Sequence, residues 1–166
     1  MIRSVVTAIY VTAATLMTAS AAYAEQHLAE LYASILACEN RECVGEAASF
    51  CMDNTEGGQS TYGMQNCLIQ EMQVWDELLN EAYGDARATA KSLDAADLET
   101  FPEYAVRDTQ VRDAQRAWIT FRDANCAMDY GLWGSGSMRV IWGAECLLRM
   151  TAERTFELRI YADGLK

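Results

Sequence analysis

The sequence has few of the side chains on which most metal and enzyme sites depend. It has one histidine, His27, and no two cysteines in C-x-x-C spacing, so a zinc site built from His and Cys lacks its usual ligand pairs. No glycine-rich loop that could hold a phosphate group is present. There is one proline, Pro102, and the alternation of apolar and polar residues typical of strands is nearly absent. These absences predict an all-α protein that needs no cofactor or metal.

Cationic side chains are also scarce. The chain has 13 Lys and Arg against 24 Asp and Glu, which gives a net charge of −11. So acidic a protein is poorly suited to bind nucleic acid or an anionic membrane, and it is suited to meet a cationic protein quickly. The same charge would also serve solubility alone, so charge does not identify a partner.

The first 24 residues have the pattern of a secretory signal peptide. Arg3 provides the positive start, the apolar stretch runs over 5–17, and residues 22–24 read Ala-Tyr-Ala, which predicts cleavage before Glu25. The stretch is shorter than the roughly 20 residues that span a bilayer, and no other segment could do so. We therefore expect an exported protein, in the periplasm or secreted, whose residues 25–166 form a single domain.

All six cysteines follow the predicted cleavage site, in a compartment that is oxidising. An even number of cysteines in an exported chain predicts disulfides. Fifteen pairings are possible, and sequence alone does not decide between them. The pairing of nearest neighbours is our first choice, because each bond would then close a turn or a helix connection: Cys38 with Cys43, Cys51 with Cys67, and Cys126 with Cys146.

Three apolar stripes with helical spacing predict three main helices. The first helix is expected to end at Gly84 or to continue to Lys91, with residues 92–102 as a connection and Pro102 able to open the next helix. Residues 130–137, rich in glycine and serine, are expected to form a loop. The stripes are Met64, Leu68, Met72, Trp75, Leu79 and Tyr83; Tyr104, Val111, Ala114, Trp118, Phe121 and Asn125; and Ile141, Ala144, Leu148, Thr151, Thr155 and Leu158.

The fold that follows is a small disulfide-stapled bundle of three main helices plus a short N-terminal helix over 27–38. Residues 39–62 are expected to be less regular, with Thr61 as the cap of the first long helix. An ion pair between Asp108 and Arg112 is expected on the outer face of the second helix, four residues apart.

Several blocks of residues resemble the LprI-type lysozyme inhibitor domain family. The blocks are Thr61-x-x-Met64-x-x-Cys67, Trp75-Asp76-x-x-Leu79-Asn80-x-x-Tyr83 and Ala114-Gln115-x-x-Trp118-Ile119-x-Phe121-Arg122-Asp123-Ala124-x-Cys126, followed by Cys146, Thr151 and Arg154. The resemblance covers about residues 51–160, and Cys51, Cys67, Cys126 and Cys146 match the four cysteines of the family. Cys38 and Cys43 are an addition to that pattern, and the gap between the first two family cysteines is longer here.

The large apolar residues shared with the family fall on the apolar stripes, so these are expected in the core: Trp75, Leu79, Tyr83, Trp118 and Phe121. Arg122 and Asp123 are adjacent and should point about 100° apart, so they are not expected to share one face of the helix. Arg122 is expected to pair with an acid on a neighbouring helix, such as Asp76 or Glu145. A structural role for these two residues is favoured, because no nucleophile or base accompanies them.

Three functions remain open at this point. The resemblance implies an inhibitor of lysozymes, and the loop residues Tyr130, Leu132 and Trp133 are the candidate contact, unless Trp133 folds back on the core. A structural or assembly partner within the cell envelope, without a lysozyme target, fits the composition equally well. A carboxylate-based cell-wall hydrolase is disfavoured but not excluded by 24 acidic residues. We therefore expect a binding protein with no catalytic residues and predict no particular oligomeric state.

Overall fold

The computed structural model describes residues 30, 33–38 and 40–164, so the predicted signal peptide and His27 lie outside the described residues. The chain divides into two compact units, Met1–Ala37 and Cys38–Lys166. In the first unit, residues 33–36 are helical, within the range predicted for the short N-terminal helix. Every regular element of the described part is a helix, which confirms the all-α class. None of the helices found there is long and apolar enough to cross a membrane.

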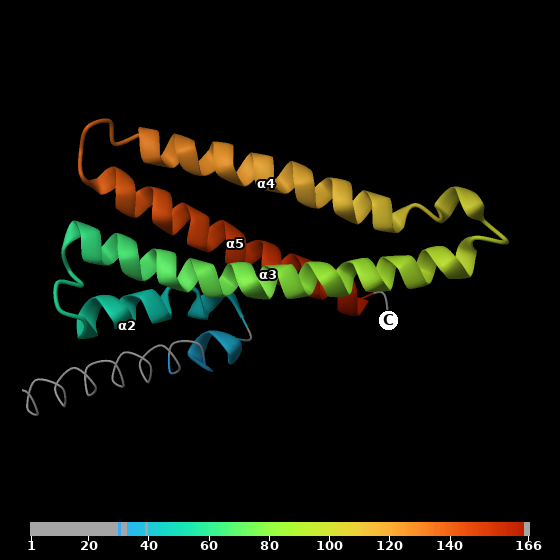
Figure 1. Ribbon diagram of the computed structural model, residues 1–166, viewed down its shortest axis with the longest axis horizontal. Helices are drawn as coiled ribbons and strands as arrows, with labels where there is room; N and C mark the ends of the chain where they lie inside the picture. The colour runs from blue at the N-terminus through green and yellow to red at the C-terminus, as the bar shows by residue number, and fades with distance from the viewer. Residues whose placement is uncertain (1–29, 31–32, 39, 165–166) are drawn as a thin grey trace, which may run out of the picture. The chain divides into compact units, whose positions relative to one another are not determined.

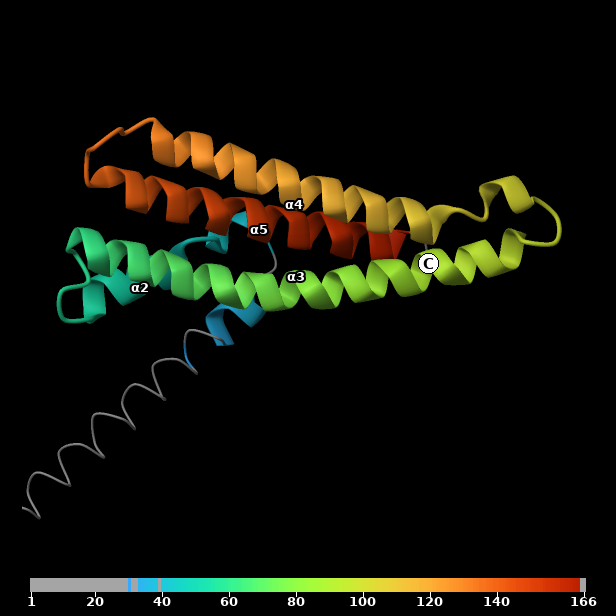
Figure 2. The ribbon, with the colours of Figure 1, turned by 45° about the horizontal axis from the view of Figure 1, so that its top comes forward.

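Three long helices make up most of the second unit, as Figure 1 shows. They are α3 (Thr61–Asp97), α4 (Arg107–Gly131) and α5 (Met138–Gly164). Helix α5 runs parallel to α3 and antiparallel to α4, and in both Figure 1 and Figure 2 it lies between them. A 3-10 helix, η1 (Arg41–Cys43), and the short helix α2 (Glu46–Asn54) precede them, and α2 packs against α3. The bundle is therefore built around the contact between α3 and α5.

The first and third apolar stripes form the core. Trp75 on α3 is fully buried, and its ring contacts that of Phe156 on α5 at a centroid distance of 5.3 Å. All six residues of the third stripe are buried. Further along, a cluster of buried aliphatic residues joins all three helices: Leu79, Ala82, Ala86, Ala90, Val111, Leu158 and Ala162. Apolar burial of this kind contributes roughly 1.5–3 kcal/mol for each large side chain.

The second stripe is only partly buried, which corrects one prediction. Phe121 is 61% exposed and Tyr104 is also exposed, whereas Trp118 is half-buried against the core cluster. Helix α4 lies at the side of the bundle and meets the others along a narrow edge. Its buried residues are therefore few: Val111, Gln115 and Cys126.

The connection between α3 and α4 is shorter than predicted, because α3 continues to Asp97. Asp94, inside the last turns of α3, accepts hydrogen bonds from the backbone N–H groups of Arg107 and Asp108, both at 3.0 Å. It therefore caps the start of α4 from the neighbouring helix. Pro102 begins a separate 3-10 helix, η2 (Pro102–Tyr104).

The expected pair between Asp108 and Arg112 is replaced by a pair between helices. Arg87 on α3 donates two hydrogen bonds to the carboxylate of Asp108, at 2.7 and 2.8 Å, and Arg112 instead bonds Asp113. The hydrogen bond from Arg87 is the main reason that the pKa of Asp108 lies below its usual value. The pair of Arg87 with Asp108 is bidentate, and two parallel hydrogen bonds make it stronger than a single contact along the helix.

Residues 39–62 are more regular than predicted, since they contain η1 and α2. The turn into α3 ends at Ser60, whose hydroxyl accepts a hydrogen bond from the N–H of Gly63 at 3.0 Å. Ser60 is therefore the cap of α3, and Thr61 is its first residue.

Two glycines of α3 should respond oppositely to alanine. A Cβ at Gly63 would collide with the carbonyl oxygen of Gly57 and with Gly58 in the preceding turn, whereas a Cβ at Gly84 would meet nothing. We expect Gly63→Ala to lower the free energy of unfolding by about 1–3 kcal/mol. We expect Gly84→Ala to raise it by about 0.5–1 kcal/mol, because alanine is the better helix former. Urea unfolding of both variants tests this, and equal effects would contradict the close packing of the turn.

Candidate functional site

Three disulfides hold the second unit together, in the nearest-neighbour pairing that the sequence favoured. They join Cys38 with Cys43, Cys51 with Cys67, and Cys126 with Cys146, with Cα–Cα distances of 5.8, 5.7 and 5.4 Å. The second bond links α2 to α3. The third links the last turns of α4 to the first turns of α5, and so fixes the base of the connection that carries the predicted binding loop.

The predicted loop is shorter than expected, because α4 extends to Gly131 and includes Tyr130. Leu132 closes the helix, and its N–H donates to the carbonyl of Met128 at 3.0 Å. Leu132 is 79% exposed. The guanidinium of Arg139 donates to the carbonyl of Gly134 at 3.2 Å, which ties the loop to the start of α5.

Trp133 neither projects freely nor enters the core. Its ring contacts the ring of Trp142 on α5 at a centroid distance of 5.5 Å, and it stays 39% exposed. Tyr130 is covered from one side by the guanidinium of Arg139, which lies 5.5 Å from the ring centroid. The two tryptophan rings thus pack against each other at the surface. An aromatic pair of this kind contributes about 0.5–1.5 kcal/mol of stability.

The structure adds two residues to the three predicted for this site. Met138 and Trp142 are also exposed, in the first turns of α5, and the ring of Trp142 contacts that of Trp133. We call these five residues the tip surface: Tyr130, Leu132, Trp133, Met138 and Trp142. The sequence did contain a signal for them. Met138 and Trp142 are apolar residues four apart on the other side of the helix from the third stripe, where polar residues are expected.

A groove runs between α3 and α4, with α5 as its floor. It consists of two adjoining hollows, of about 410 and 560 Å³, which share Asp123 and Leu147. The lining residues repeat at helical spacing on each of the three helices. They are Gln65, Ile69, Met72, Gln73, Asp76 and Glu77 on α3; Arg122, Asp123, Cys126, Ala127 and Tyr130 on α4; and Val140, Gly143, Ala144 and Leu147 on α5.

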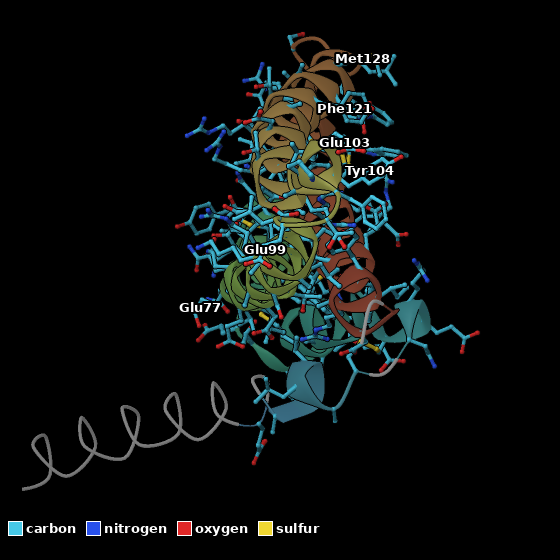
Figure 3. All side chains as sticks on the ribbon, turned by 90° about the vertical axis from the view of Figure 1, so that its right-hand side faces the viewer. Glu77, Glu99, Glu103, Tyr104, Phe121 and Met128 are labelled. Carbon is cyan, nitrogen blue, oxygen red and sulfur yellow. A yellow bond between two sulfur atoms is a disulfide. The ribbon has the colours of Figure 1, made fainter. Side chains whose placement is uncertain are left out.

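The groove and the exposed apolar residues of α4 lie on different sides. Figure 3 looks along the bundle from the α3–α4 turn, where Glu99 and Glu103 are labelled. Glu77, which lines the groove, points to one side of the bundle, whereas Phe121 and Met128 point to the other. Phe121 and Met128 are seven residues apart and therefore share a face of α4.

Arg122 joins α4 to α3 at one end of the groove. Its guanidinium donates to Asp123 at 2.9 Å, approaches Asp76 at 3.9 Å, and lies 5.1 Å from the ring centroid of Trp118. The pairing with Asp76 was one of two predicted. The expectation that Arg122 and Asp123 do not share a face is corrected, since both line the same hollow and the long arginine side chain folds back to its neighbour.

Two guanidinium groups lie close to the ring of Trp118. The second belongs to Arg154 on α5, 5.8 Å from the ring centroid, and it donates to the buried amide oxygen of Gln115 at 2.9 Å. These contacts join α4 to α5. Within the part of the chain that the structure describes, no group of three or more His, Cys, Asp or Glu is arranged to hold a metal ion.

Glu71 is the polar residue that the sequence analysis missed. Its side chain is fully buried, and its carboxyl oxygens accept hydrogen bonds from three N–H groups: Gly45 at 2.8 Å, Ala48 at 2.7 Å and the indole of Trp75 at 3.1 Å. Gly45 and Ala48 are at the start of α2, so Glu71 caps that helix from α3. The available signal was its position, four residues before Trp75 on the apolar stripe.

The comparisons with known proteins agree with the resemblance in the sequence. Residues 51–158 match the model of the family described as lysozyme inhibitor LprI. An uncharacterized 17.7 kDa protein from the puhA 5' region of Rhodobacter capsulatus is 26% identical over 127 residues, which cover 76% of this chain and 78% of that protein. The uncharacterized protein YecT of Escherichia coli (strain K12) is 27% identical over 122 residues, covering 67% and 70% of the two chains. No solved structure matches this chain.

Proposed function

Because the chain belongs to the LprI family of lysozyme inhibitors, we propose that it is an exported protein that binds and inhibits a lysozyme through the tip surface. The observation that carries this proposal is the exposure of Leu132, at 79%, on the connection between two helices, α4 and α5, that the Cys126–Cys146 disulfide joins. A large apolar side chain in that position gains by being covered, since its full burial is worth roughly 1.5–3 kcal/mol.

The tip surface has the features of a contact for a protein partner. It contains two tryptophans and a tyrosine that are partly exposed. Tryptophan and tyrosine are enriched among the residues that contribute most of the binding energy at protein interfaces. The Cys126–Cys146 bond, the Arg139 hydrogen bond and the contact between the tryptophans hold the loop in place before binding. A loop that is already ordered loses less entropy when the partner arrives.

The charge of the protein supports a cationic partner. Cleavage before Glu25 would remove one cation, Arg3, and no acid, so the net charge would change from −11 to −12. Long-range attraction of this kind accelerates association, and it weakens as salt shortens the screening length to about 8 Å at physiological ionic strength. Cationic lysozymes outside the cell membrane are partners of that charge.

The experiment is a titration of the oxidised, exported protein against chicken-type, goose-type and invertebrate-type lysozymes, with lysis of cell walls as the readout. It is run at low and at physiological salt. Inhibition of at least one type at both salt concentrations supports the proposal. No inhibition of any type, with mass spectrometry confirming intact disulfides, would overturn it and favour a structural partner within the envelope.

Removal of the apolar side chains of the loop should weaken inhibition. We expect Leu132→Ala and Trp133→Ala each to raise the inhibition constant by about 10- to 100-fold, the range for residues at the centre of an interface. Leu98→Ala is the matched control, because Leu98 is also exposed but lies next to the α3–α4 turn at the other end of the bundle. If the control and the loop variants inhibit equally well, the tip surface is not the contact.

A further inference from the structure

We propose that the groove between α3 and α4 binds an amphipathic helix flanked by Lys or Arg, presented by the protein partner. The inference goes beyond the tip surface, and it rests on the proposed function only for the identity of that partner. It is carried by the shape of the groove, its length and the charge of its lining, and each of these points to the same occupant.

The arrangement of the helices leaves room for one more. Helix α5 lies between α3 and α4 (Figure 2), and the two hollows are lined by residues of all three helices. The floor is formed by small and apolar side chains of α5, such as Val140, Ala144 and Leu147. A helix laid over this floor would contact all three helices and complete a four-helix bundle, which is a recurrent way for proteins to recognise a helix.

The length of the groove suits a short helix. Its lining on α3 extends from Gln65 to Glu77, twelve residues further along the helix, which is about 18 Å at 1.5 Å per residue. An occupant of about 12 residues, or three turns, would therefore fill it. The apolar walls formed by Ile69 and Met72 match a single apolar face, which such a helix would supply at positions three and four residues apart.

The charge of the groove lining indicates which residues should lie beside the apolar face of the bound helix. The lining residues include three carboxylates, on Asp76, Glu77 and Asp123, and one guanidinium, on Arg122. The side chain of Arg122 is only 17% exposed, whereas those of Asp76 and Asp123 are 49% and 58% exposed. Asp76 and Asp123 both pair with Arg122, and the lining as a whole carries two more negative than positive charges. Lys or Arg beside the apolar face of the occupant would complement it, whereas Glu or Asp would be repelled.

The test measures binding of a helical peptide of about 14 residues, with leucines on one face and lysines beside them, to the exported, oxidised protein. A second peptide with glutamates in place of the lysines is the charge control. We expect the lysine peptide to bind and Ala127→Phe to weaken its binding at least tenfold, because the added ring fills the groove. Ala117→Phe is the matched variant, since Ala117 is exposed on α4 but does not line the groove.

The contribution of the acidic residues is tested separately. Asp76→Asn with Glu77→Gln should weaken binding of the lysine peptide by about five- to tenfold at low salt, whereas Glu99→Gln with Glu103→Gln, at the other end of the bundle, should change it less than twofold. Equal binding of both peptides, or equal loss in both phenylalanine variants, would overturn the proposal. A dimer of the protein that only Ala127→Phe disrupts would also overturn it, because a second copy would then be the occupant.

Failure of the proposed function and failure of the groove proposal give different results. Binding of the lysine peptide with the expected variant pattern, but without inhibition of any lysozyme, supports the groove and leaves the partner to another cationic protein. Inhibition of a lysozyme that is unchanged in Ala127→Phe, without competition from the peptide, overturns the groove and leaves the tip surface intact.

Discussion

Replacing Glu71 with alanine will lower the free energy of unfolding by about 3–5 kcal/mol. The variant leaves three N–H groups without an acceptor, and each unsatisfied buried donor costs about 1–3 kcal/mol. The hydrogen bonds of Ala48 and of the Trp75 indole are both buried, so water reaches neither group without a rearrangement. The variant also removes side-chain volume next to the fully buried Trp75.

The effect of Glu71→Ala should extend beyond its own position, because the side chain caps α2. We expect α2 to lose order in the variant, and amide exchange in Glu46–Asn54 to accelerate more than elsewhere. Glu71→Gln keeps the size but only one acceptor oxygen, so it should be destabilised less. Glu81→Ala, at an exposed position of the same helix, is the control and should stay within about 0.5 kcal/mol of wild type. Urea unfolding and hydrogen exchange measure both effects, and similar stability of all three variants would contradict the capping role.

Removing the Cys126–Cys146 disulfide should have the next largest effect. The bond closes a loop of 20 residues, and the entropy of such a loop in the unfolded chain corresponds to about 3 kcal/mol of stability. Cys126→Ala with Cys146→Ala should lose that amount in chemical unfolding. Cys38→Ala with Cys43→Ala opens a loop of only 5 residues and should lose about 2 kcal/mol by the same relation.

The two double variants should differ more in function than in stability. Without Cys126–Cys146 the start of α5 is no longer joined to the end of α4, so the loop with Leu132 becomes less ordered and inhibition of a lysozyme weakens. Without Cys38–Cys43 the tip surface is unchanged. Both variants are measured at a temperature at which circular dichroism shows that they are folded. Equal inhibition by the two would indicate that the loop is held by Arg139 and Trp142 alone.

The parts of the fold that could be predicted are those that a local sequence pattern determines. The first and third stripes identified α3 and α5, because both helices bury one whole side against each other. The second stripe failed at Phe121, since α4 touches the bundle along one edge and the rest of its apolar surface stays exposed. The end of α3 and the existence of α2 also escaped prediction. Both regions take part in long-range caps that the local sequence does not reveal: Asp94, near the end of α3, caps the start of α4, and Glu71 caps α2.

The candidate site was predictable to the same limited extent. Tyr130, Leu132 and Trp133 were found because they interrupt a segment rich in glycine and serine, between two cysteines. Met138 and Trp142 were not, because the contact of Trp142 with Trp133 is visible only in the packed structure. The groove could not be found in the sequence, since its lining comes from three helices and each contributes only one edge.

The disulfides are distributed unevenly along the bundle, so its two ends are held by different kinds of interaction. Cys51–Cys67 and Cys126–Cys146 lie toward the end where α3 and α5 begin, whereas the α3–α4 turn is held by Arg87, Arg107 and their aspartates. Local opening is more frequent where fewer buried contacts hold the elements together. We therefore expect a protease to cut the α3–α4 turn more readily than the connection between α4 and α5.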